Sequence, residues 1–149
     1  MARWANAGMP DLEHLTFSGA LISKYLFEET RYCFAYGQYL AVIVLGMAFI
    51  ERTFASEFYA LGRNDLERAS ISALLREARD MGWLNAEEYA ALDRARQIRN
   101  PVTHFRRPGH NDSIEYRMVD ADEFPYDIIE ADARTIASAV MHVLGRNAI

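Results

Sequence analysis

The chain is organised around one apolar stretch, YCFAYGQYLAVIVLGMAFI, at residues 32–50. Gln38 is its only plainly polar residue, and its length approaches that of a membrane-spanning helix. We interpret it as the centre of a helical bundle or a subunit interface, because both places suit a helix that is apolar on every side. No membrane span is expected, since charges of both signs flank the stretch and the basic flanks typical of a span are absent: Glu28, Glu29, Arg31, Glu51 and Arg52.

The helical pattern continues beyond this stretch and becomes amphipathic. Gly62 is a suitable residue just past a helix end, so the sequence predicts one long helix from about Tyr32 to Leu61. Two glycines inside it, Gly37 and Gly46, each lower helix propensity by about 1 kcal/mol relative to alanine. We therefore expect them to mark the close approach of a neighbouring helix.

Length and composition indicate one globular domain. The 149 residues are 51% hydrophobic, enough for a sizeable core, so we assign residues 1–149 to a single domain with residues 1–10 as a loose tail. A net charge of −5 argues against coating nucleic acid through bulk attraction. Cys33 is the only cysteine and the N-terminus lacks a signal-peptide pattern, so we expect a cytoplasmic protein. The histidines outside the motif described below have no ligand partners at suitable spacing, so neither a metal nor a cofactor is expected: His14, His110 and His142.

The remaining elements also read as helices. Asn85 followed by Glu88 is a capping box, the clearest helix start in the chain. The loop before the last helix is rich in turn formers and includes a short stretch, 114–118, that alternates like a strand. We predict an all-α antiparallel bundle of four or five helices, with an irregular loop before the last one. The other predicted helices start near Asp11, at Asp65 or Ser70 with an end at Gly82, and around 128–132 with an end at Gly145.

The candidate functional stretch is Arg99-Asn100-Pro101-Val102-Thr103-His104, at the end of the helix that Asn85 starts. Pro101 removes a helical hydrogen bond and clashes with the carbonyl four residues earlier, so the helix should kink or stop near Asn100. Alternatively, Asn100 as N-cap and Pro101 as first residue restart a helix along a new axis. On an unbroken helix Arg99 and His104 would lie about 140° apart, whereas a break can bring both to one cleft.

This motif resembles the signature of the HEPN superfamily, Arg-Asn-x-x-x-His, here Arg99-Asn100-x-x-x-His104. The region from Gln38 to Arg106 also resembles the superfamily core, in which a long apolar helix and a short helix precede the helix that carries the motif. The resemblance implies an all-α fold. It also implies a homodimer in which two motifs share one cleft.

Many HEPN members are metal-independent endoribonucleases, often toxins or components of defence systems. By resemblance, Arg99 would hold the scissile phosphate, His104 would be the general acid/base, and Asn100 would orient the 2′-OH or fix the bend. These residue types suit the chemistry, because arginine grips phosphate oxygens with a charged fork and histidine exchanges protons near neutrality. Glu51 is a candidate for orienting Arg99 or His104. Some toxin members carry, two residues after the histidine, a tyrosine that a partner nucleotidyltransferase modifies; Arg106 stands there in this chain.

Plainer interpretations stay open beside this one. Arg99 and His104 also suit the end of a helix, where cations interact with the last carbonyls and the dipole. The nearby cations Arg96, Arg106 and Arg107 are candidate RNA contacts or solvated surface residues. The alternative function is a HEPN-like module without activity that dimerises, binds a nucleotide or regulates. The partners expected under the first hypothesis are RNA, a second copy, and an antitoxin or nucleotidyltransferase.

Overall fold

The computed structural model describes residues 20–146, and within them the chain is helical without any strand. This confirms the all-α prediction, but the six α-helices exceed the expected four or five. The elements are α2 (Ala20–Ala35), α3 (Tyr39–Ala60), the 3-10 helix η2 (Asn64–Leu66), α4 (Ile71–Asp80), α5 (Ala86–Thr103), α6 (Ile114–Ala121) and α7 (Pro125–Gly145). Residues 1–10 and the start of the predicted first helix lie outside the described residues.

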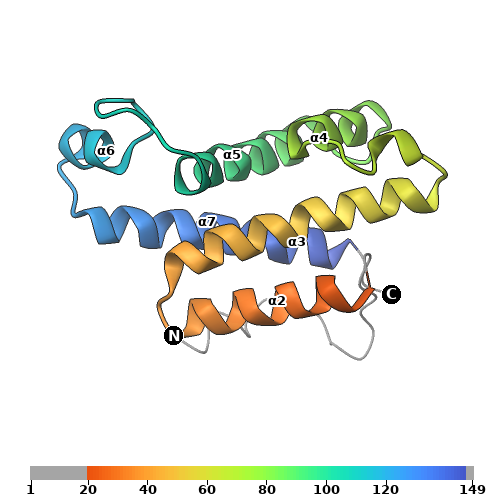
Figure 1. The fold of residues 1–149 in the computed structure, drawn as a ribbon, viewed down its shortest axis with the longest axis horizontal. Coiled ribbons are helices and arrows are strands. Elements are labelled where there is room, and N and C mark those ends of the chain that lie inside the picture. The colour runs from red at the N-terminus through yellow and green to blue at the C-terminus, as the bar shows by residue number, and fades with distance from the viewer. Residues whose placement is uncertain (1–19, 147–149) are drawn as a thin grey trace.

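The helices are arranged around a central pair, α3 and α7 (Figure 1). α2 packs on one side of this pair, and α4 and α5 lie on the other. In Figure 1, α2 and α5 run in one direction while α3 and α7 run in the opposite direction. The short α6 sits beyond the C-terminal end of α5 and packs against α7.

The apolar helix α3 is the hub of the bundle, as predicted. It packs against α2, α4, α5 and α7 and contributes ten buried residues: Tyr39, Val42, Ile43, Gly46, Met47, Phe49, Ile50, Thr53, Phe54 and Phe58. Within residues 20–146 it is the one helix long and apolar enough to cross a membrane by length and composition, and half of its most apolar window is buried inside the fold. Burial in the bundle therefore accounts for much of its apolar character.

Gly46 allows α7 to approach α3, as its place in the sequence predicted. A Cβ atom added here would lie 2.6 Å from Ile136 Cγ2 and 3.1 Å from Val140 Cγ2. Carbon atoms in favourable contact lie about 3.5–4.0 Å apart, so any side chain at this position would push the two central helices apart.

Gly37 has a different role from the one predicted. The long helix does not begin at Tyr32, because α2 continues to Ala35 and the chain turns at Gly37, whose φ is +72°. The amide N–H of Gly37 donates to the Phe34 carbonyl at 3.2 Å, and that of Gln38 donates to the Cys33 carbonyl at 2.8 Å. These bonds form the Schellman motif that ends a helix at a glycine in the left-handed region.

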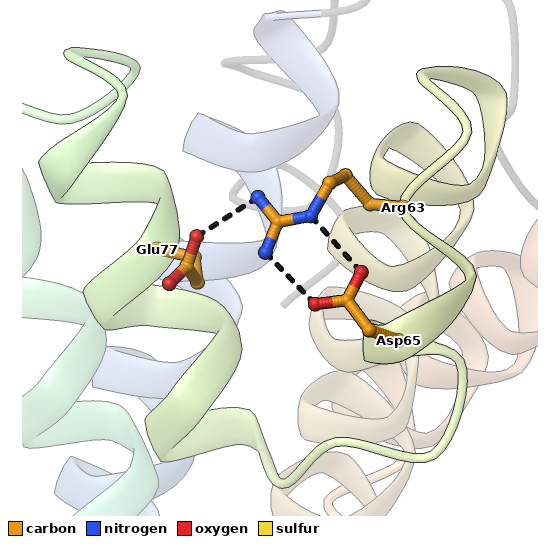
Figure 2. A network of polar contacts seen from close by, with 3 residues as sticks. All are labelled: Arg63, Asp65 and Glu77. Carbon is orange, nitrogen blue, oxygen red and sulfur yellow. Dashed lines mark hydrogen bonds and ion pairs between the residues drawn. The ribbon is translucent and has the colours of Figure 1, made fainter.

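The connection between α3 and α4 is held by a polar network (Figure 2). Arg63 donates from Nε and Nη2 to the two oxygens of Asp65 and from Nη1 to Glu77 Oε2, each at 3.0 Å. The hydrogen bonds to Asp65, followed in size of effect by the one to Glu77, raise the pKa of Arg63. The hydrogen bonds from Arg63 lower the pKa of Asp65. Of the two predicted starts for the next helix, Ser70 caps α4 by accepting from the Ala73 N–H at 3.2 Å.

The segment before the last helix is more ordered than predicted. Residues 114–118 belong to the helix α6 rather than to an extended piece. Ser113 caps α6 by accepting from the Tyr116 N–H, and Asp122, at φ 51°, ends it. The alternation of apolar and polar residues was too short to separate strand from helix, and a strand here would have had no partner.

Candidate functional site

The site predicted from sequence lies at the C-terminal end of α5, whose start is firmly fixed. Asn85 Oδ1 accepts from the Glu88 N–H at 2.8 Å, and Glu88 Oε1 accepts from the Asn85 N–H at 3.1 Å. The capping box is therefore confirmed. Two hydrogen bonds to the Glu88 carboxylate lower its pKa: the first comes from the Asn85 N–H, and the second, 2.8 Å long, comes from His142 Nε2.

Pro101 lies inside α5, and the helix continues past it to Thr103. The predicted stop near Asn100 is therefore wrong, and no separate helix starts at Pro101. The amide N–H of His104 donates to the Asn100 carbonyl at 2.9 Å, and the chain becomes extended at His104 with φ −123° and ψ 132°. Packing of α5 against α3, α4 and α7 offsets the roughly 3 kcal/mol that an internal proline costs a helix.

Arg99 and His104 occupy different parts of this helix end. Arg99 is half-buried and His104 is exposed. Within residues 20–146 neither side chain takes part in a hydrogen bond or ion pair, and nothing joins them to each other. Arg99 lies within α5, whereas His104 follows its last residue and has extended dihedrals, with Pro101 between the two.

Arg96 and Asn100 are linked to each other along one side of α5. Arg96 Nε donates to Asp93 Oδ1 at 2.7 Å, and Gln97 Nε2 donates to Asp93 Oδ2 at 2.9 Å. With the Asn100 amide oriented to satisfy both of its groups, its oxygen accepts from Arg96 Nη1 and its nitrogen donates to the Arg96 carbonyl, each at 3.2 Å. The hydrogen bond from Arg96 lowers the pKa of Asp93. The Arg96 side chain is thus held on the surface of α5 by Asp93 and Asn100.

Arg106 is also engaged, whereas the Arg107 side chain is exposed and has no hydrogen-bond or ion-pair partner within the described part of the chain. Arg106 Nε donates to Asp112 Oδ2 at 2.9 Å, and Asp112 Oδ1 contacts His110 Nδ1. Desolvation raises the pKa of Asp112, but the hydrogen bonds from Arg106 and His110 outweigh it, so that the pKa is lowered. This cluster closes the loop that follows α5.

Glu51 is half-buried on α3. In residues 20–146 it makes no hydrogen bond or ion pair with Arg99, His104 or any other arginine. The structure therefore shows no orienting contact from Glu51 to the motif.

Two cavities flank the end of α5, and sequence reasoning did not anticipate them. The polar cavity, of about 350 Å³, is lined by Arg94, Gln97, Ile98, Pro101, Asn111, Asp112 and Arg117. The apolar cavity, of about 440 Å³, shares Ile98, Pro101, Asp112 and Arg117 with it, and its further apolar lining comes from Leu40, Ile43, Val102, Phe105, Ile114 and Ile129. Neither cavity is lined by Arg99 or His104.

The walls of these cavities are anchored by a partly buried ion pair between α6 and α7. Arg117 Nη1 donates to Asp132 Oδ2 at 2.6 Å and Nη2 donates to Oδ1 at 3.0 Å. The Asp132 side chain is only 11% exposed, and its hydrogen bonds raise the pKa of Arg117. Nothing in the sequence signalled this pair, because its members lie 15 residues apart in different helices.

No group of three potential metal ligands occurs within residues 20–146, and His14 lies outside them. Cys33 is buried, and burial followed by the charge of Glu29 raises the pKa of its thiol. Comparison of the chain with protein-family models, with curated proteins and with solved structures finds no match.

Proposed function

We propose that the protein is a metal-independent endoribonuclease of the HEPN type that uses Arg99 and His104. One observation carries the proposal. Arg96 and Arg106, the arginines on either side of the motif, are held by carboxylates, whereas Arg99 and His104 have no polar side-chain partner within residues 20–146. The two residues that the motif assigns to catalysis are thus available for a substrate.

The chemistry follows from these two residue types. An imidazole takes the proton from an RNA 2′-OH, the 2′ oxygen bonds to the adjacent phosphorus, and the bond from phosphorus to the 5′ oxygen breaks. A protonated imidazole supplies the proton that the leaving 5′ oxygen needs, and the product carries a 2′,3′-cyclic phosphate. Arg99 neutralises the charge that develops on the phosphate oxygens.

A second copy of the chain would supply the second imidazole. Three exposed apolar side chains line the apolar cavity next to the motif: Leu40, Val102 and Phe105. Phe105, which directly follows His104, is 88% exposed, and the apolar cavity lies on the same surface. A projecting ring and a recess on one face suit a two-fold interface, in which the same patch meets itself. We propose that Phe105 of each copy enters the other copy's cavity and brings the two His104 side chains together.

The proposed cellular setting follows from the same resemblance. We place the enzyme in the cytoplasm as a toxin or defence component, with the single cysteine Cys33 kept as a buried thiol. An antitoxin remains a proposed partner. Modification of a tyrosine after the motif by a nucleotidyltransferase is not proposed, because Arg106, paired with Asp112, occupies that place.

The test is cleavage of a labelled RNA in EDTA with analysis of the product ends. Wild-type protein should cut and leave cyclic phosphates, while His104→Ala and Arg99→Ala should cut at least about a hundredfold more slowly, as for loss of a general acid/base. Arg76→Ala, an exposed arginine of α4 without a hydrogen bond within residues 20–146, is the matched control and should keep full activity. Undiminished cleavage by His104→Ala, or a requirement for added metal, would refute the assignment.

A HEPN-like module without activity is the second candidate, and one observation favours it. A catalytic base is normally oriented by a third group, and His104 has no such partner within residues 20–146. A protein that is dimeric, binds RNA and leaves it intact in EDTA would point to this alternative. Phe105→Ser should be monomeric whether or not the protein cleaves RNA. Sedimentation of this variant therefore tests the proposed dimer interface independently of the function.

A further inference from the structure

The polar cavity beside α5 has the features of a ligand site separate from the proposed catalytic surface. Arg94 and Gln97 line it from positions one helical turn apart, and Pro101 follows one turn later, so the three share one side of α5. Arg99 is five residues from Arg94, about 140° around the helix axis. A molecule in the polar cavity would therefore lie on a different flank of α5 from Arg99.

One arginine beside the polar cavity has a side chain without a polar partner within residues 20–146. Asp112 is paired with Arg106, and Arg117 is paired with Asp132. Arg94 is exposed and has no hydrogen bond or ion pair within residues 20–146. The Arg94 guanidinium is therefore free to receive an anion.

Further donors surround this guanidinium. Asn111, on the opposite wall, has an exposed side chain that makes no hydrogen bond among residues 20–146. Arg117 uses two of its N–H donors on Asp132, and an arginine carries five. A phosphate group offers more oxygens than a carboxylate and so suits this set of donors better.

The rest of the lining is apolar and fixed. Ile98 and Pro101 form a wall against which the ring of a ligand can pack. The opposite wall is anchored by the partly buried pair of Arg117 and Asp132 and by the contact of Asp112 with Arg106. At about 350 Å³ the cavity is within the volume range of small-molecule sites, and five of its seven lining residues are polar.

We infer that the polar cavity binds a small organic phosphate, with Arg94 and Asn111 on the phosphate and the organic body against Ile98 and Pro101. This inference goes beyond the proposed ribonuclease and does not depend on it. A His104→Ala protein that has lost RNA cleavage should bind the same ligand unchanged.

The test is an NMR titration of the full ¹⁵N-labelled chain with phenyl phosphate, in parallel with inorganic phosphate, phenol and benzoate. Phenyl phosphate should shift the amide signals of Gln97, Ile98, Asn111 and Asp112. Inorganic phosphate and phenol, each lacking one half of the ligand, should bind at least about tenfold more weakly, and benzoate should also bind more weakly, since its carboxylate offers fewer oxygens.

Variants decide whether the polar cavity is the site. Arg94→Gln should weaken binding of phenyl phosphate about tenfold or more, the loss expected for one charge-assisted hydrogen bond. Arg76→Gln removes an equal charge from the α4 surface and should leave binding unchanged. Equal affinity in Arg94→Gln, shifts confined to residues outside the polar cavity, or no binding up to about 10 mM would overturn the inference. A benzoate affinity matching that of phenyl phosphate would overturn the choice of phosphate.

Discussion

Replacement of Gly46 by alanine should destabilise the fold, although alanine is the better helix former. The new Cβ would meet Ile136 Cγ2 at 2.6 Å, about 1 Å inside an ordinary carbon contact. That methyl group is attached directly to the branched Cβ of Ile136, so it can move away only through a change of the χ1 rotamer, which a helix disfavours for a β-branched residue, or through a shift of α7. Overpacking costs about 1–3 kcal/mol, and this overlap belongs at the upper end. Alanine returns about 1 kcal/mol of helix propensity, which leaves an expected loss of about 1–2 kcal/mol.

The assay is urea unfolding followed by circular dichroism. The wild-type chain, Gly46→Ala and Gly46→Val should rank in that order of decreasing unfolding free energy, because valine adds more atoms to the same contact. Gly145→Ala is the matched control, since nothing lies within 4 Å of a Cβ at that helical glycine. Gly145→Ala should leave the free energy of unfolding unchanged or raise it slightly. A Gly46→Ala protein as stable as wild type would refute the close packing of α3 on α7.

Three further predictions concern polar contacts and use the same unfolding measurement. Asn85→Ala should lower the free energy of unfolding by about 1 kcal/mol, because it removes the side chain that caps α5. Asp132→Asn should lower the free energy of unfolding by about 2 kcal/mol, because it removes the charge that pairs with the partly buried guanidinium of Arg117. The double change Arg117→Met with Asp132→Leu should recover most of this loss, and no recovery would argue against the desolvation of the pair. The pKa of Asp93 is lowered by Arg96 in the folded state, so acid favours the unfolded state, which binds the proton more readily. The stability difference between wild type and Asp93→Asn should therefore be full at pH 7 and shrink below about pH 4, and a difference that grows in acid would contradict it.

Which residues of each helix are buried could largely be predicted from sequence. In the last helix, Ile136, Ala137, Val140, Val143 and Leu144 have the spacing of a single helix face, and all five are buried. Side chains that recur every three or four residues lie on one face of a helix, and packing then buries that face.

Patterns that depend on distant residues could not be predicted in the same way. The turn at Gly37 interrupts an apolar run with apolar residues on both sides, so hydrophobic periodicity gave no sign of it. Arg96 and Arg106 were candidate RNA contacts, and the structure instead shows each of them holding an aspartate. The sequence placed the positive charges near the motif, but it did not distinguish the paired ones from the free ones.

The sequence by itself determined an all-helical chain, the capping box at Asn85 and a helix end carrying Arg99 and His104. Such features depend on residues within a few positions of one another, and backbone geometry determines which of those residues are in contact. Only the tertiary structure decided that α5 passes through Pro101, that α3 and α7 touch at Gly46, and that Arg94 lines a cavity with an unpaired guanidinium. These depend on side chains far apart in the chain, whose contacts and charge balance exist only once the helices are packed.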